Sequence, residues 1–204
     1  MRFSETAIAG VIVIQPDFHR DARGYFLETF HAGKYGHAGI AAAFVQDNHS
    51  CSAHRTLRGL HMQVQKPQGK LIRVVNGEIW DVAVDVRPSS PTCGQWIADV
   101  LSADNFKQLY VPPGCAHGFC VLSDTAQVQY KCTELYDPAD EIGIAWNDPE
   151  LAIRWPIVDP LLSNRDRRHG SLRDALASIR DRLALSASTL SQRSSTQTAH
   201  SMNE

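Results

Sequence analysis

The sequence lacks the features that mark membrane and nucleic-acid-binding proteins. No apolar run approaches the ~20 residues that a membrane-spanning helix needs. Residues 1–10 contain Arg2 and Glu5 where a secretory signal would carry an apolar core. The formal net charge is only -2, so no excess of positive charge would attract nucleic acid or an acidic membrane. We therefore expect neither nucleic acid nor membrane as a partner.

The sequence also lacks the cysteine pattern of a disulfide framework or zinc knuckle and the glycine-rich turn that binds dinucleotides. The five cysteines are odd in number and irregularly spaced, and no C-x-x-C occurs. This pattern argues against a disulfide framework and against a zinc knuckle, so we expect reduced thiols in a cytoplasmic protein. There is no G-x-G-x-x-G fingerprint of a dinucleotide-binding turn. We accordingly expect no redox cofactor.

Short β patterns fill most of the chain that remains. With 204 residues, of which 43% are hydrophobic, the chain is long enough for one domain with a sizeable core. The clearest pattern places Asn76-Gly77 between apolar runs at 71–75 and 78–86, which predicts a β-hairpin. In the second run, alternation predicts one packed face and one face that carries Asp81 and Asp85.

More strands are expected beyond this pair. Strands are expected at 95–101, 108–111, 117–122 and 127–136, and turn residues follow each of them. Many short strands at even spacing, with no helix-length segment between them, predict a sandwich or barrel. Only a small helix near residues 31–36 is expected among them.

The composition changes after Pro160. Leu172, Leu176, Ile179 and Leu183 recur at helical spacing, and Ser171 can cap a helix with Asp174 three residues later. We predict a barrel domain over 1–170 and an amphipathic helix over 171–185. The Ser- and Thr-rich residues 186–204 are predicted to be disordered.

His61 is the first candidate for chemistry, within T-L-R-G-L-H-M-Q-V-Q. A metal site in a barrel of this kind usually needs an H-x-H pair, but Gln63 fills the second position. A later P-x-G-x-x-H, which ends at His117, would supply only one more ligand. We therefore expect no metal.

Proton transfer suits the same residues better. A neutral imidazole can take up a proton near neutral pH, and it works best when a carboxylate orients its other nitrogen. Asp81, Asp85 and Asp166 are all candidates for that carboxylate. Tyr130 could donate a proton on the opposite face of a substrate, and Lys70 could stabilise an oxyanion. Taken singly, these residues could instead be a core histidine, a barrel-lining aromatic ring and a solvated strand charge.

Nine segments together resemble the dTDP-4-dehydrorhamnose 3,5-epimerase family. They are D-A-R-G-Y-F-L-E (21–28), F-V-Q-D-N-H-S (44–50), L-R-G-L-H-M-Q (57–63), Q-G-K-L-I-R-V (68–74), D-V-A-V-D-V-R (81–87), L-Y-V-P-P-G-C-A-H-G-F (109–119), Y-K-C-T-E-L-Y (130–136), E-I-G-I-A-W-N-D-P (141–149) and P-L-L-S-N-R-D (160–166). The resemblance covers roughly residues 8–166. It implies a mainly β fold, a cupin-type double-stranded β-helix (jelly-roll) barrel with short peripheral helices.

The resemblance also implies roles for individual residues. His61 resembles the proton acceptor with Asp166 as its partner, Tyr130 the proton donor, and Lys70 the group that faces the sugar ketone. The expected substrate contacts are Gln46, Asn48, Arg58, His117, Tyr136 (on the thymine), Glu141 and Arg165, together with Arg23, Phe26 and Glu28, which would reach the nucleotide in a neighbouring subunit. A homodimer with exchanged N-terminal segments is therefore expected.

The implied reaction is epimerisation at C3 and C5 of dTDP-4-keto-6-deoxy-D-glucose without a cofactor. The product would be dTDP-4-keto-L-rhamnose, an intermediate of dTDP-L-rhamnose synthesis. Met62, Cys115 and Arg165 depart from the family's usual residues. They leave open a 3-epimerase of another deoxysugar pathway, and a non-catalytic sugar-nucleotide-binding cupin is a further alternative.

Overall fold

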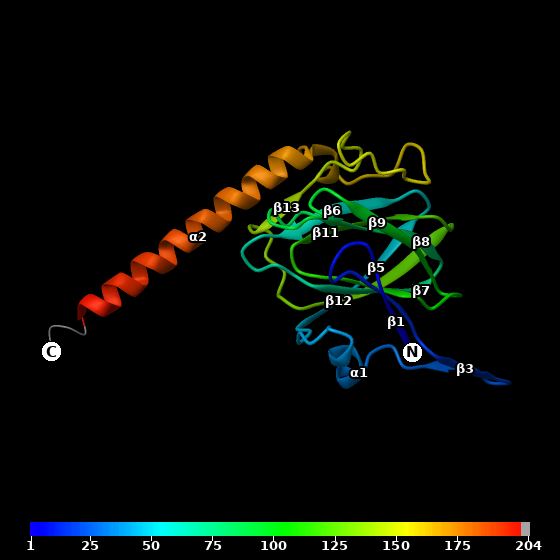
Figure 1. The fold of residues 1–204 in the computed structure, drawn as a ribbon. Helices are drawn as coiled ribbons and strands as arrows, with labels where there is room; N and C mark the ends of the chain where they lie inside the picture. Colours follow the sequence, from blue (N-terminus) through cyan, green and yellow to red (C-terminus); the bar gives the residue numbers. More distant parts are fainter. Residues whose placement is uncertain (201–204) are drawn as a thin grey trace.

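A computed structural model describes the backbone of residues 1–200 and the side chains of residues 1–186. Two antiparallel sheets pack face to face as a jelly-roll barrel, and a separate hairpin leaves the body (Figure 1). The six-stranded sheet has the order β1 (Arg2–Glu5), β2 (Ile12–Gln15), β10 (Gln108–Val111), β7 (Lys70–Asn76), β12 (Thr125–Cys132) and β5 (Gln46–Ala53). The five-stranded sheet has the order β13 (Glu141–Gly143), β6 (Leu57–Gln63), β11 (Cys115–Val121), β8 (Glu78–Asp85) and β9 (Trp96–Ser102).

The barrel interior is filled by apolar side chains from both sheets. Ile72 and Val128 of the six-stranded sheet meet Ile79 and Phe119 of the five-stranded sheet in one buried cluster. Burial of this kind stabilises by about 25 cal/mol for each Å² of apolar surface removed from water. The cluster fixes the distance between the sheets, and with it the width of any cavity between them.

Strand β8 packs on both faces, which differs from the prediction of one packed and one carboxylate-bearing face. Ile79 belongs to the barrel interior, while Val82 and Val84 pack in a second cluster with Leu172 and Ile179 of the C-terminal helix. Alternation alone could not reveal this, because the second cluster is completed by residues almost a hundred positions away.

The predicted hairpin at Asn76-Gly77 is wrong. Gly77 does form a tight turn with φ +76, but β7 pairs with β10 and β12 while β8 pairs with β11 and β9. The turn therefore passes the chain from one sheet to the other. A Cβ at Gly77 would lie 2.0 Å from the backbone oxygen of Thr125, so only glycine fits there. The dipeptide predicts the turn, and the partners of each strand are decided by the barrel.

The C-terminal helix α2 (Leu172–His200) begins where the sequence predicts. Ser171 Oγ accepts a hydrogen bond from the backbone N–H of Asp174, and the Asp174 carboxylate accepts one from the backbone N–H of Ser171, which together form a capping box. The helix continues past the predicted end at residue 185 as far as His200, while the disorder expected over 186–204 stays a prediction. No glycine or proline follows Gly170, so nothing interrupts propagation. Residues 201–204 lie outside the described part.

Helix α2 is neither short nor buried along its whole length. Figure 1 shows it leaving the barrel as a long projecting rod. Its first turns are held by Leu172, Ala175 and Ile179, but Leu183 is 46% exposed, so the predicted apolar stripe is covered only at its N-terminal end. No helix among the described residues has the length and apolar character needed to cross a membrane.

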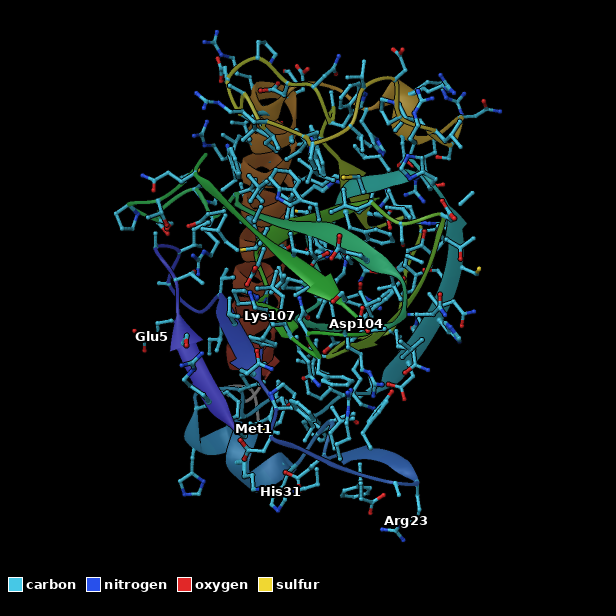
Figure 2. The ribbon with its side chains drawn as sticks, turned by 90° about the vertical axis from the view of Figure 1, so that its right-hand side faces the viewer. Met1, Glu5, Arg23, His31, Asp104 and Lys107 are labelled. Atoms are coloured by element: carbon cyan, nitrogen blue, oxygen red, sulfur yellow. The ribbon has the colours of Figure 1, made fainter. Side chains whose placement is uncertain are left out.

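Near the N-terminus, β3 (Phe18–Asp21) and β4 (Gly24–Leu27) form a two-stranded hairpin outside the barrel. Figure 2 shows Arg23 at its outer end, directed away from the body. The small helix α1 (Ala32–His37) follows within one residue of its predicted position, with the side chain of His31 accepting from the backbone N–H of Lys34 at its start. A 3-10 turn, η1 (Asp166–Arg168), precedes α2.

Candidate active site

One cavity of about 420 Å³ collects every predicted site residue from Gln46 onward. The lining residues from the prediction are Gln46, Asn48, Arg58, His61, Lys70, His117, Tyr130, Tyr136, Glu141, Arg165 and Asp166. They come from strands of both sheets, from the loop between β12 and β13, and from the segment around η1. A volume of this size is in the range of pockets that hold a small-molecule ligand.

His61 is paired with Asp166. Its Nε2 lies 2.6 Å from Asp166 Oδ1, and the Asp166 side chain is 5% exposed. Burial alone would raise the pKa of Asp166, but the close approach of the His169 ring and hydrogen bonds from His61 and Ser163 hold it well below its usual range. The carboxylate is therefore ionised and can only accept. His61 Nε2 must carry the hydrogen, which leaves Nδ1 as the basic nitrogen.

The two other candidate carboxylates serve different partners. Asp81 Oδ1 accepts a hydrogen bond from Nε2 of His117 at 2.7 Å, and both side chains are buried. Asp85 binds Arg87 through two hydrogen bonds of 2.8 Å and also accepts from Ser90. Asp166 is thus the residue that pairs with His61, and Asp85 stabilises the loop that follows β8.

Lys70 reaches the cavity from the opposite sheet rather than from a strand beside His61. It begins β7 in the six-stranded sheet, whereas His61 lies in β6 of the five-stranded sheet. Burial lowers the pKa of the Lys70 ammonium, and Cys132, Glu141 and Asp81 nearby partly offset this effect. A cation in such surroundings interacts strongly with any negative charge that develops beside it.

Tyr130 also enters from the six-stranded sheet, on β12. Its ring packs against the barrel interior, and burial raises the pKa of its phenol. The phenol therefore keeps its proton near neutral pH and can act as an acid. Because His61 and Tyr130 lie on opposing sheets of one cavity, a sugar ring held between them would have the base and the acid on different faces.

Polar contacts organise the outer part of the cavity. Arg165 donates to the Tyr136 hydroxyl at 2.9 Å and forms an ion pair with Glu141. The backbone N–H of Tyr136 donates to Gln46 at 2.8 Å. Tyr136 nevertheless remains 44% exposed, so part of its side chain is accessible to a ligand. An exposed aromatic ring at a pocket edge suits stacking on a nucleobase.

His61, Asp166 and His169 also form the one group of metal-ligating side chains found among the described residues, with donor atoms within 4.8 Å of one another. The contact of 2.6 Å between His61 and Asp166 is a hydrogen-bond distance. Two ligands on one tetrahedral zinc would stand about 3.3 Å apart. The geometry therefore fits a hydrogen-bonded dyad better than a metal site.

The remaining predicted contacts lie away from this cavity. Arg23, Phe26 and Glu28 belong to the projecting hairpin and the residue after it, and Phe26 is 72% exposed. In the isolated chain Arg23 pairs with Asp21 and Glu28 with Lys34. The cavity also contains residues that were not predicted: Ser50, Gln68, Phe119, Cys132 and Ser163. All five stand within the family-like segments quoted above, and Ser163 also stands three residues before Asp166, where it can cap the backbone.

Comparisons with known proteins agree with the site. The profile of the dTDP-4-dehydrorhamnose 3,5-epimerase family matches residues 5–174. A dTDP-4-dehydrorhamnose 3,5-epimerase of Methanothermobacter thermautotrophicus is 48% identical over 176 residues, which are 85% of this chain and 95% of that protein. The crystal structure of a 3,5-epimerase of Legionella pneumophila Philadelphia 1 in complex with dTDP-4-keto-L-rhamnose superposes with a TM-score of 0.84 at 45% identity, over 87% of this chain and 96% of that one. A dTDP-4-dehydrorhamnose 3-epimerase of Streptomyces niveus is 40% identical over 82% of each chain. The chain belongs to the dTDP-4-dehydrorhamnose 3,5-epimerase family.

Proposed function

We propose that the protein inverts C3 and C5 of dTDP-4-keto-6-deoxy-D-glucose to give dTDP-4-keto-L-rhamnose. The observation that carries this proposal is the His61–Asp166 pair facing Tyr130 across one cavity. Both carbons flank the C4 ketone, so their hydrogens are acidic and can leave as protons. The site supplies a base, an acid and a cation for this chemistry from its own side chains.

Each inversion follows from carbonyl chemistry. Nδ1 of His61 takes a proton from the carbon next to the ketone, and Asp166 stabilises the imidazolium that forms. The electrons move onto the ketone oxygen, where Lys70 stabilises the enolate charge. Tyr130 or water then returns a proton to the opposite face of the carbon. Once His61 has released its proton to solvent and Tyr130 has regained one, the same steps at the second carbon complete the reaction.

The polar and aromatic residues around His61, Lys70 and Tyr130 bind the substrate. The guanidinium of Arg58 suits phosphate oxygens, since it presents a planar fork of donors, and its Nε is oriented by Ser52 Oγ at 3.0 Å. His117, fixed by Asp81, lines the same cavity and can accept a hydrogen bond from a sugar hydroxyl through Nδ1. Tyr136 is positioned to stack on thymine, with Gln46 and Asn48 beside it.

Deuterium incorporation tests the reaction directly. With dTDP-4-keto-6-deoxy-D-glucose in deuterated water, we expect proton NMR to show deuterium entering at both C3 and C5 as product forms. Exchange at C3 alone would identify a 3-epimerase, as the relative from Streptomyces niveus is named. Absence of exchange at both carbons would leave a non-catalytic sugar-nucleotide-binding protein.

A homodimer in which the β3–β4 hairpin completes the partner's site is part of the proposal. Its support is the exposure of Tyr25 (55%) and Phe26 (72%) on a hairpin that leaves the barrel (Figure 2). Such apolar exposure on a projecting segment is typical of an interface. We expect a dimer by light scattering at micromolar concentration.

Mixing of inactive chains tests the exchange itself. Co-expressed Arg23→Ala and His61→Asn chains should regain about a quarter of the parent activity, because half the dimers are mixed and one of their two sites is intact. Each variant expressed alone is the control. If Arg23 served its own chain's site, the mixed preparation would stay as inactive as the separate ones.

We further propose that the enzyme acts in the cytoplasm, within dTDP-L-rhamnose synthesis. Three of its five cysteines, Cys115, Cys120 and Cys132, are buried free thiols, and burial raises the pKa of each. Thiols of this kind are typical of proteins in reducing compartments.

A further inference from the structure

We propose that His169 is a positioning residue of the active site, which shares the Asp166 carboxylate with His61 and thereby sets the proton affinity of the base. This inference rests on the proposed epimerase function, since it concerns the same base. The reaction steps described above assign no role to His169.

Two imidazoles, those of His61 and His169, lie together with the carboxylate of Asp166. Nε2 of His169 lies 3.3 Å from Asp166 Oδ1, the oxygen that also accepts from His61. The rings of His61 and His169 meet edge to face with centroids 5.2 Å apart. The His169 side chain is only 10% exposed. Among the described residues its buried Nε2 has no well-formed hydrogen bond, so the carboxylate is the acceptor it faces.

Backbone contacts on both sides of His169 hold its ring beside Asp166. Gly170 forms a bridge with Ile144, and its carbonyl accepts from the backbone N–H of Ala145 at 2.8 Å. The ring lies directly on Gly143, where a Cβ would come within 2.2 to 2.4 Å of three ring atoms. Gly143 stands opposite His61 in the pairing of β13 with β6. A side chain at Gly143 would thus occupy the space that His169 fills.

Sharing one carboxylate has a defined electrostatic result. Ser163 donates to the other oxygen, Oδ2, at 2.8 Å, so Oδ1 is left to the two imidazoles. The N–H dipole of His169, 3.3 Å from Oδ1, offsets part of the negative charge that would otherwise stabilise a protonated His61. His61 therefore holds a proton less tightly than it would in a simple dyad, and more of it is in the basic form when pH is lowered.

A matched pair of variants separates this role from a structural one. Gln and Met have similar shapes, but only Gln keeps a donor near the place of Nε2. We expect His169→Met to move the acidic limb of the pH profile of kcat/KM upward by about 0.5 to 1 pH unit. His169→Gln should stay within about 0.2 unit of the parent.

Other charged or ionisable groups line the same cavity as His61. They are unchanged in the parent, the His169→Met and the His169→Gln proteins. They are Arg58 on its own strand, Lys70 on β7, His117 on β11, Tyr130 on β12, Glu141 on β13, and Arg165 and Asp166 at η1. A difference between the Met and Gln variants can therefore be assigned to the donor at residue 169.

The midpoint of the His61 ring titration, followed by NMR in the substrate-free protein, gives a readout that needs no activity. We expect it to rise in the Met variant and not in the Gln variant. Gly143→Ala, which displaces the ring without changing it, should shift the midpoint in the same direction. Equal midpoints in parent, Met and Gln proteins would overturn the inference, even with an active enzyme. A shifted midpoint in a protein that lacks epimerase activity would refute only the proposed function.

Discussion

Replacement of His61 by Asn is expected to lower kcat by about 10³-fold or more at both carbons. The variant keeps a polar side chain of similar reach, so the cavity and its contacts are preserved. It has no basic nitrogen, and no other residue of the cavity pairs with Asp166 to act as base on that face. Deuterium incorporation at C3 and at C5 should fall together, because one base serves both carbons.

The control is His54→Asn, which changes an exposed histidine whose Nδ1 lies 3.1 Å from the backbone oxygen of Ser123, outside the cavity. It should have the parent's rate. Binding of dTDP by the His61 variant, measured by calorimetry, should remain within a few-fold of the parent. A His61→Asn enzyme that turns over at the parent rate would remove His61 from the mechanism and would favour a sugar-nucleotide-binding role.

Much of the fold could be predicted from local patterns. Turn residues and apolar runs predict the strands β9 to β12, and the capping pattern at Ser171 predicts the start of α2. Strand partners could not be predicted in this way, since they depend on loop closure between distant segments. Asn76-Gly77 shows the limit, because the turn forms as expected but joins two sheets. Composition also could not predict where α2 ends, because polar residues alone do not stop a helix that is already nucleated.

The site could be predicted only where chemistry and family motifs supported each other. His61 and Tyr130 carry recognisable proton chemistry, but the residues alone left three possible carboxylates for His61. The structure resolves this choice by distance, since Asp81 and Asp85 are engaged with His117 and Arg87. His169 carried no signal at all. Its role depends on the space above Gly143, which exists only after β13 has paired with β6.

Replacement of Asp166 by Asn should lower kcat by about 10²-fold or more while leaving substrate affinity almost unchanged. The amide has the shape of the carboxylate but no charge to stabilise the imidazolium of His61. Its NH₂ group can also donate to His61 Nε2, and this would place the ring hydrogen on Nδ1, the nitrogen that must accept the substrate's proton. Both effects act on the base after binding, so they affect kcat rather than KM.

Asp99→Asn is the matched control for this variant. Asp99 also accepts a hydrogen bond, of 2.9 Å from the Nζ of Lys107, but it lies on β9 outside the cavity. Its replacement should therefore leave kcat unchanged. Thermal unfolding distinguishes damage to the fold from damage to the base, because a lost catalytic charge lowers kcat without a matching fall in Tm. An Asp166→Asn enzyme with the parent's kcat would show that His61 needs no charged partner. In that case the shared carboxylate could not set its proton affinity, and the role proposed for His169 would fall with it.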